Sequence, residues 1–388
     1  MKKLKLIDVA PYSGKRVQPF DGVKRYLSTG DLQDEGLSFE EVTFNSKPSR
    51  ADILVSEGDI LFAKMLNTNK VLQIDKSLDG IIVSTGFSVH NPDENVLYGN
   101  YLIQFLKNNS FLKQKNKFCT GAIQSAITNI GIEKILIPVP SLSYQIYIAT
   151  ILSKAELIID QRKKSIDFLD EFLKSTFGEI FGDPQINKKQ WNIDFLGKVI
   201  ETLTDYHANG SYEILRDNVV LKKEPDYALM VRTTDLEKND FSTDCNFIDE
   251  KTYNFLEKSK VFGGEIIINK IGSAGKVYLM PHLNRPTSLG MNSFLLRFTK
   301  DVNNIYIYYL LTSDFGKNSI AKHVKGAVTK TITKEAVRSI KIPIPPLELQ
   351  IQFANIVTKT DVVKGQYKKS LKELEKLYDS LCQQAFKV

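Results

Sequence analysis

The sequence predicts a mixed α/β (α+β) fold, with two globular units separated by a long antiparallel two-helix coiled coil and related by an internal pseudo-twofold duplication. The segment IPVPSLSYQIYIATILSKAE (137–156) recurs 205 positions later as IPIPPLELQIQFANIVTKTD (342–361). A long amphipathic segment follows each copy, and short apolar runs typical of β-strands precede each copy. A chain of 388 residues has room for two or three domains of roughly 100–200 residues each.

The duplication extends beyond these two segments. Three further pairs keep the same offset or nearly so: GAIQSAIT (121–128) with GAVTKTIT (326–333), GDILFAK (58–64) with GEIIINK (264–270), and TGDL (29–32) with TTDL (233–236). Solenoid repeats are only about 20–50 residues long, so a period of this size indicates a duplicated domain pair. Each copy consists of a globular part followed by a helical tail.

The order of these parts defines four regions. We expect a first globular domain at 1–140, a central helix at 141–183, a second globular domain at 184–345 and a C-terminal helix at 346–388. Prolines precede each helix, where they hold the chain extended and are tolerated up to the first turn. The sequence FGDP (181–184) ends the first helix with glycine and proline in the usual order.

Apolar residues three and four positions apart predict a packing seam along each helix. The seam comprises Ile166, Leu169, Leu173 and Phe177 in the first helix, and Leu371, Leu374, Tyr378 and Leu381 in the second. Each tail of about 38 residues corresponds to roughly 57 Å of α-helix. A single helix cannot bury its own seam, so we expect the two to pair antiparallel, with the globular units near opposite ends. In the alternative arrangement, each tail folds back onto its own domain.

Local patterns within the globular parts predict both strands and helices. DILFAKM (59–65) and GEIIINKIG (264–272) are apolar runs typical of buried strands. YLIQFLKN (101–108) and NIYIYYLLTS (304–313) are typical of helices. Clusters of Asn, Asp, Gly and Ser separate these segments as turns.

Composition restricts the class of protein. Hydrophobic residues make up 42% of the chain, which supports folded cores, and the net charge of +7 permits a polyanionic partner. The first residues, MKKLKLIDVA, lack the apolar stretch of a signal peptide, and no apolar run reaches the ~18–20 residues of a membrane span. We therefore expect a cytoplasmic protein without a membrane partner. Cys119, Cys245 and Cys382 form no CxxC pair, which fits a reduced compartment.

No catalytic or metal-binding constellation is evident. The four histidines, His90, His207, His282 and His323, lack metal-ligand spacing with one another or with cysteine. NKIGSAGK (269–276) lacks the spacing and the final Ser or Thr of a phosphate-binding loop. Neither a GxSxG nucleophile turn nor a proline-proline-aromatic site for methyl transfer to base amines is present. We therefore expect no catalytic residues and no bound metal, and interpret the protein as a binding protein.

Polar and basic turns at corresponding positions are the candidate binding sites. AKMLNTNK (63–70) and NKIGSAGK (269–276) combine lysine with Asn, Thr or Ser, which suits phosphate groups and base edges. The candidate DNA-binding residues are Arg25, Thr29, Lys64, Asn67, Thr68, Lys70, Gln124, Ser125, Arg232, Thr233, Asn269, Lys270, Ser273, Lys276, Thr329 and Lys330. Alternatively, these turns are solvated connections whose glycines serve only the backbone.

The architecture resembles the specificity subunit of Type I restriction–modification systems over nearly the whole chain. The most specific feature is the pattern IPxPxLxxQ, present at Ile137–Gln145 and Ile342–Gln350 and followed each time by a long helix. FGDP after the first helix and GDIL in the first unit also match that family. The departures are small: Glu265 replaces the aspartate of GDIL in the second unit, and Ser141 stands where Pro346 stands in the second helix prefix.

The resemblance implies a function and partners. Two variable target recognition domains each recognise half of a bipartite, non-palindromic site in double-stranded DNA. The helices separate these domains and dock two methyltransferase subunits, and restriction (nuclease) subunits can join. The chain itself would bind no cofactor, because S-adenosylmethionine belongs to the methyltransferase, and ATP and Mg belong to a nuclease subunit if one is present. At ~57 Å, the spacer would place the half-sites about one ~34–36 Å turn apart on one face of the DNA.

Two hypotheses from other classes remain open. The first is a coiled-coil adaptor that joins two partner proteins without DNA contact; in that case, replacing the turn lysines would leave the DNA affinity of the complex unchanged. The second is an enzyme with an unrecognised site, which would methylate DNA on its own when given S-adenosylmethionine.

Overall fold

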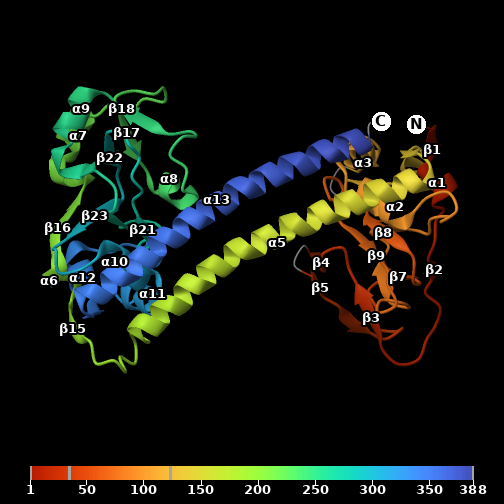
Figure 1. Cartoon of the computed structure of the whole chain (residues 1–388), viewed down its shortest axis with the longest axis horizontal. Helices are drawn as coiled ribbons and strands as arrows, with labels where there is room; N and C mark the ends of the chain where they lie inside the picture. The colour runs from red at the N-terminus through yellow and green to blue at the C-terminus, as the bar shows by residue number, and fades with distance from the viewer. Residues whose placement is uncertain (1, 34–35, 122–124, 387–388) are drawn as a thin grey trace. The chain divides into compact units, whose positions relative to one another are not determined.

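The computed structural model describes residues 2–33, 36–121 and 125–386, and the chain divides into two compact units (Figure 1). Unit 1 comprises Met1–Ser165 and Tyr367–Val388, and unit 2 comprises Ile166–Gln366. The long helices α5 (Leu142–Phe181) and α13 (Leu347–Ala385) each contribute one part to each unit.

Unit 1 contains two principal sheets and a set of short helices. The strands are β1 (Lys2–Lys5), β2 (Lys15–Arg16), β3 (Lys24–Leu27), β4 (Leu32–Gln33), β5 (Gly36–Leu37), β6 (Glu40–Val42), β7 (Ala51–Leu54), β8 (Ile60–Ala63), β9 (Val71–Gln73), β10 (Ile82–Ser84), β11 (Phe87–His90), β12 (Cys119–Thr120), β13 (Ala126–Ile127) and β14 (Leu136–Val139). The short helices are α1 (Leu6–Val9), α2 (Gly99–Leu106), α3 (Asn109–Lys117) and α4 (Asn129–Ile132). The principal sheets have strand orders β2-β7-β10-β3-β6 and β11-β8-β9.

Unit 2 has the same general composition. Its strands are β15 (Asn192–Phe195), β16 (Ile200–Asp205), β17 (Ala228–Val231), β18 (Asn246–Ile248), β19 (Lys260–Val261), β20 (Ile266–Asn269), β21 (Val277–Leu279), β22 (Thr287–Leu289), β23 (Ser293–Phe298) and β24 (Lys341–Ile344). Its short helices are α6 (Leu196–Val199), α7 (Tyr212–Asn218), α8 (Thr233–Lys238), α9 (Glu250–Phe255), α10 (Asn304–Thr312), α11 (Asp314–Ala321) and α12 (Lys334–Arg338), with 3-10 turns η1 (Tyr206–Asn209) and η2 (Glu257–Ser259). The sheets have orders β16-β23-β20-β21 and β18-β17-β22-β19.

The two units share one topology. The order β7-β10-β3-β6 corresponds to β19-β22-β17-β18, and in both the central pair is parallel while the flanking pairs are antiparallel. The order β11-β8-β9 likewise corresponds to β23-β20-β21. Unit 1 adds β2 at one edge, and unit 2 adds β16. The duplication that the sequence predicts is therefore confirmed at the level of strand pairing.

The predicted strands and helices of the globular parts are also confirmed. All four residues of β8 and of β20 are buried, as expected for apolar runs packed on both faces. Helix α2 covers residues 101–106 of the segment 101–108 predicted as helical in unit 1, and α10 covers residues 304–312 of the segment 304–313 in unit 2. The adjoining helices α3 and α11 begin with side-chain caps from Asn108 and Ser313, which accept hydrogen bonds from backbone N–H groups of the first turn.

Parts of both long helices complete the hydrophobic core of each unit. In unit 1, Ile148 and Leu152 of α5 and Phe386, just after α13, pack with Tyr101 and Phe105. In unit 2, the corresponding residues are Phe177 and Phe181 at the end of α5 and Phe353 near the start of α13, packed with Tyr306 and Tyr309. The helices therefore pair with each other, and each helix contributes to the cores of both units. The alternative arrangement, in which each tail folds back onto its own domain, is wrong.

The predicted seam residues lie in different surroundings along these helices. Ile166, Leu173 and Phe177 are buried in unit 2, whereas Leu169, Leu371 and Leu374 are only half-buried. Tyr378 and Leu381 pack against the hydrophobic core of unit 1.

Polar contacts join the two long helices within each unit. In unit 1, the guanidinium of Arg162 lies 4.2 Å from the ring centroid of Tyr367, and Lys163 forms a salt bridge of 3.5 Å with Glu375. In unit 2, Lys364 forms a salt bridge with Asp170. Ion pairs that remain open to solvent in this way each contribute at most about 1 kcal/mol to stability.

The repeated IPxPxLxxQ segment is the joint between each globular part and its long helix. The side chain of Gln145 is fully buried; its Oε1 accepts from the backbone N–H of Tyr98, and its Nε2 donates to the carbonyls of Val96 and Pro140, all at 2.9 Å. Tyr101 completes the joint by donating its hydroxyl to the carbonyl of Pro138 at 2.8 Å.

The same joint recurs in unit 2. Gln350 is fully buried, accepts from the N–H of Asn303 at 2.8 Å and donates to the carbonyl of Pro345 at 2.7 Å. Tyr306 donates to the carbonyl of Pro343 at 2.8 Å. The sequence repeats this segment because each buried glutamine must satisfy the same backbone groups at the start of a helix.

Among the helices of the described residues, α5 is long and apolar enough, by length and composition alone, to cross a membrane. This differs from the expectation that the sequence contains no segment of that kind. Packing within unit 1 accounts for part of this apolar character, because Ile148, Ala149 and Leu152 are buried in the core. Glu156 on the same helix accepts hydrogen bonds from Gln104 and Tyr378 at 2.9 Å each. These contacts are typical of a helix packed within a protein.

Candidate nucleic-acid interface

Three segments meet at the same place in each unit. In unit 1, the N–H of Lys64, just after β8, donates to Gly86 between β10 and β11 at 2.9 Å. The carbonyl of Lys64 accepts from Ile127 at 2.9 Å, and Met65 bridges to Ala126. The loop that follows β8 is thereby held between the turn that joins β10 to β11 and strand β13.

Unit 2 repeats this arrangement with different side chains. The N–H of Lys270, just after β20, donates to Asn292 at 2.8 Å, and its carbonyl accepts from Ile332 at 3.0 Å. Ile271 bridges to Thr331. The correspondence shows that the loops singled out in the sequence occupy equivalent places in the two folds.

In unit 1, most of the candidate residues lie together. The Nζ of Lys70 donates to the carbonyl of Thr29 at 2.8 Å, and the Nζ of Lys64 donates to the carbonyl of Thr85 at 3.2 Å. Leu66, between Lys64 and Thr68, donates its N–H to the carbonyl of Ser125 at 2.9 Å. Burial lowers the pKa of Lys64 from its ordinary value. The cluster therefore comprises the following candidates: Thr29, Lys64, Asn67, Thr68, Lys70 and Ser125.

Two unit 1 candidates stand apart from this cluster. The guanidinium of Arg25 donates to the carbonyl of Ser77 and lies 5.0 Å from the ring centroid of Phe39, so protein contacts engage it. Gln124 lies outside the described residues.

In unit 2, the candidate loop is closed by its own side chains. The Nδ2 of Asn269 donates to Ser273 Oγ at 2.8 Å, and the carbonyl of Asn269 accepts from Gly275 at 2.8 Å. The N–H of Gly272 donates to the carbonyl of Lys330 at 3.0 Å. The side chain of Lys276 turns to Glu237, at 2.9 Å.

A short hairpin beside this loop carries the last two candidates. Lys325 and Thr331 exchange backbone hydrogen bonds of 2.9 and 2.8 Å, so the residues between them form the tip. Thr329 and Lys330 are exposed there, and Val328 is 99% exposed. A protruding tip with one lysine and one apolar side chain suits insertion against a groove of nucleic acid.

An ionic cluster beneath the loop contains residues that the sequence did not single out. Asp205, at the end of β16, forms salt bridges with Lys270 at 2.7 Å and Lys334 at 3.2 Å. His207 Nδ1 lies 3.2 Å from the Nζ of Lys270. Asp205, His207 and Lys334 are distant in sequence from the loop, and no local pattern marks them.

The charges of this cluster shift two pKa values. Burial alone would raise the pKa of Asp205, but hydrogen bonds and attraction from Lys270 and Lys334 lower it. The pKa of His207 is lowered by burial and then by the charge of Lys270. Two lysines share one carboxylate, which leaves a net positive charge at the surface.

A hollow of about 310 Å³ adjoins the turn that contacts Lys270. Its lining includes Arg232, Thr233, Asn246, Met291 and Asn292. The guanidinium of Arg232 donates to the carboxylate of Asp235 at 2.7 Å, and the same carboxylate accepts from the backbone N–H of Arg232 at 2.8 Å at the start of α8. Arg232 is therefore positioned by the protein, with Thr233 and Asn292 beside it.

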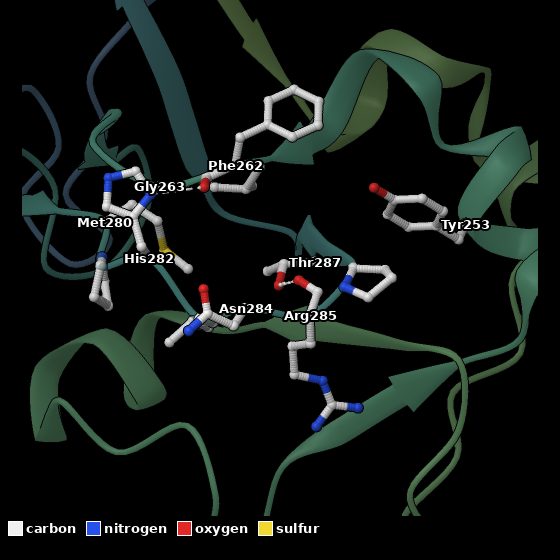
Figure 2. A pocket seen from close by; sticks show the side chains of 12 residues that line it. Tyr253, Phe262, Gly263, Met280, His282, Asn284, Arg285 and Thr287 are labelled. Carbon is white, nitrogen blue, oxygen red and sulfur yellow. Dashed lines mark hydrogen bonds between the residues drawn. The ribbon is translucent and has the colours of Figure 1, made fainter.

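A second hollow, of about 250 Å³, is lined by residues that include Phe262, His282 and Thr287 (Figure 2). Thr287 is the first residue of β22, and the turn that contacts Lys270 follows the other end of this strand. His282 Nδ1 donates to the carbonyl of Phe262 at 3.2 Å, and a Cβ at Gly263 would lie only 2.3 Å from that nitrogen. Gly263 also has φ of +102°, so glycine is required there. The ring of Phe262 is 65% exposed.

The described residues contain no group of three or more His, Cys, Asp or Glu side chains that could hold a metal ion.

Two topologically equal units, each presenting a basic and polar loop cluster, characterise a duplicated DNA-binding scaffold. The chain belongs to the family described as the Type I restriction modification DNA specificity domain, whose model matches residues 1–168 and 190–376. Members of this family are the non-catalytic components that recognise DNA sequence in restriction–modification systems, and the comparisons give the adaptor hypothesis no support.

Individual proteins show the same similarity. The chain is 25% identical over 385 residues to the Type I restriction enzyme MjaVIII specificity subunit of Methanocaldococcus jannaschii, covering 92% of this chain and 84% of that protein. It is also 25% identical over 333 residues to the putative type I restriction enzyme MjaX specificity subunit of the same organism, covering 82% and 75%.

Two solved structures share the fold. One is a chain from a study of complex assembly and conformational transition of the type I R-M system, with a TM-score of 0.62, 18% identity and coverage of 99% and 97% of the two chains. The other is the S subunit of a Type I restriction–modification system from M. genitalium, with a TM-score of 0.60, 15% identity and coverage of 99% and 96%.

Proposed function

We propose that each unit recognises one half of a bipartite, non-palindromic target in double-stranded DNA. The observation that supports this most is the pair of equivalent loop clusters built on one topology. The unit 1 cluster presents Lys64, Asn67 and Thr68, whereas the unit 2 cluster presents Lys270 and Ser273. Different side chains at equivalent places suit two different half-sites. The helices would set the spacing, with unread base pairs between halves about one helical turn apart.

We further propose that the duplicated helices dock two methyltransferase subunits. Several apolar side chains are exposed at helix positions that correspond through the 205-residue offset. The exposed fractions are 47% and 44% for Ile146 and Ile351, and 55% and 59% for Leu157 and Val362. A matched pair of apolar surfaces suits two copies of one partner.

The remaining chemistry would reside in those partners. S-adenosylmethionine would be bound by the methyltransferase, and ATP and Mg by restriction subunits if they join the complex. This chain would bind no cofactor and would act in the cytoplasm, where its DNA target is accessible.

Methylome sequencing of cells with and without this chain tests the proposal. We expect one bipartite motif, with different halves, to be methylated only when the chain is present with its methyltransferase. A gel-shift titration of the complex at stated salt should show preference for that motif. The proposal is wrong if methylation is unchanged, if the motif is a single block, or if the complex binds all DNA sequences equally.

A further inference from the structure

Lys115 of α3 is fully buried beneath the candidate loop of unit 1. Its Nζ donates to the backbone carbonyls of Ala63 at 3.0 Å, Met65 at 2.9 Å and Thr68. The three N–H groups of the ammonium therefore each have a carbonyl acceptor from the strand end or the loop. Burying a charge is costly unless it is fully hydrogen-bonded, so this loop conformation and the ammonium depend on each other.

The same region of the fold holds the loop at two further points. Asn116 accepts from the N–H of Asn67 at 3.0 Å and donates to the side-chain oxygen of Asn67 at 2.8 Å. Asn67 has φ of +56°, in the left-handed region. Asn69 donates to the carbonyl of Lys107, between α2 and α3. Together with Lys115, these contacts restrain the loop backbone along its length.

This fixed loop presents side chains suited to base edges. Met65 and Leu66 are 38% and 41% exposed, and Asn67 is exposed beside them. Apolar side chains can contact the methyl group of thymine, and asparagine can pair with adenine in the major groove. Such discrimination requires the loop backbone to be held in place.

Unit 2 fixes its loop in another way. At the position 205 residues after Lys115 stands Ile320, which is buried in the core and approaches Gly275. The unit 2 loop is closed instead by the contact of Asn269 with Ser273. A buried ammonium therefore supports the loop of unit 1, whereas a hydrogen bond between two side chains closes the loop of unit 2.

We propose that Lys115 is a positioning residue for sequence discrimination, holding the Met65–Asn69 loop in the shape that recognises one half-site. This inference rests on the proposed function of the chain. Burial lowers the pKa of Lys115 to about 8, so the ammonium form is dominant at pH 7. Because Lys115 is covered by the loop, it acts through the backbone and does not itself touch DNA.

The full chain, co-expressed with its methyltransferase, provides the test. Methylome sequencing would compare wild type with Lys115→Met, which retains bulk but removes the ammonium. We expect methylation to tolerate at least one substitution in one half-site, with discrimination there reduced about tenfold, and the other half-site unchanged. The second half-site is an internal control, because misfolding of the whole chain would impair both.

Two further variants complete the design. Lys113→Met, at an exposed position of the same helix, should leave both halves unchanged. Asn116 is half-buried, and Asn116→Ala removes its hydrogen bonds to Asn67. This variant should reduce sequence discrimination at the same half-site as Lys115→Met. If Lys115→Met does not accumulate as folded protein, Asn116→Ala decides the matter.

The outcomes separate this inference from the proposed function. A wild-type chain that directs no bipartite methylation would refute the proposed function itself. A wild-type bipartite motif that stays equally strict in Lys115→Met and Asn116→Ala would refute the positioning role alone. Equal loss at both half-sites would also refute it, because the three hydrogen bonds of Lys115 restrain the loop of unit 1.

Discussion

Replacing Gln350 with alanine should destabilise unit 2 strongly for a single polar substitution. The side chain is fully buried, and its amide satisfies the N–H of Asn303 and the carbonyl of Pro345 at 2.8 and 2.7 Å. Alanine would leave both backbone groups buried without a partner. Each such orphaned group costs about 1–3 kcal/mol, so the free energy of unfolding should fall by about 2–6 kcal/mol.

The helix offers a matched control two residues away. Gln352 is exposed on the same turn of α13, so Gln352→Ala changes helix propensity but breaks no buried contact. Its effect on the free energy of unfolding should stay within about 0.5 kcal/mol. The difference between the two variants therefore isolates the buried hydrogen bonds from the chemistry of the substitution.

Tryptophan fluorescence provides a local readout of the unfolding. Trp191 is the single tryptophan of the chain, lies in unit 2 and donates its indole N–H to the carbonyl of Phe181 at 2.7 Å. Urea titrations followed at Trp191 should show an earlier transition for Gln350→Ala than for Gln352→Ala. Equal midpoints for the two variants would show that the repeated glutamine does not hold the helix joint, and the explanation of the repeated segment would fail.

Three other predictions concern the core, the interface and pH. Phe177→Ala should lower the free energy of unfolding by about 3–5 kcal/mol, because this ring packs among other aromatic rings. Phe172→Ala, at a 51% exposed position of the same helix, should have little effect. Equal effects of the two variants in thermal unfolding would contradict this packing. Lys270→Ala should weaken DNA binding by the complex and reduce the salt slope by about 1, while Lys300→Ala on an exposed turn should not; an unchanged slope for Lys270→Ala would exclude a phosphate contact. His90 is buried with its pKa lowered from 6.5 to about 4, mainly by burial, so the unfolded chain binds the proton first as pH falls below 6.5. Stability should therefore decrease by about 2 kcal/mol between pH 7 and pH 5, and a His90→Gln variant should lose this part of the pH dependence; if the variant keeps it, other groups are responsible.

The repeated segments were sufficient to predict the architecture, because they contain the starts of both long helices and a short-range part of each joint. The prolines and Gln145 or Gln350 form contacts within a few residues of the helix start, and such contacts leave a readable pattern. The apolar runs at β8 and β20 were equally readable, since strands buried on both faces require continuous apolar sequence.

The candidate interface was predictable only in part. The lysines of the two loops are adjacent to predicted strands, and the structure places them at equivalent positions. The partners that restrain them are remote in sequence: Asp205 lies 65 residues before Lys270, and Lys115 lies 47 residues after Thr68. Such pairings depend on how sheets and helices assemble, and single-sequence patterns carry no signal for them.

The division of the two long helices between the units has a consequence for synthesis on the ribosome. Unit 2 is one continuous stretch, Ile166–Gln366, whereas unit 1 needs residues from both ends of the chain. The core of unit 1 includes Cys382, Ala385 and Phe386, which are synthesised after the whole of unit 2. Part of the apolar surface of unit 1 therefore stays uncovered until α13 has left the ribosome.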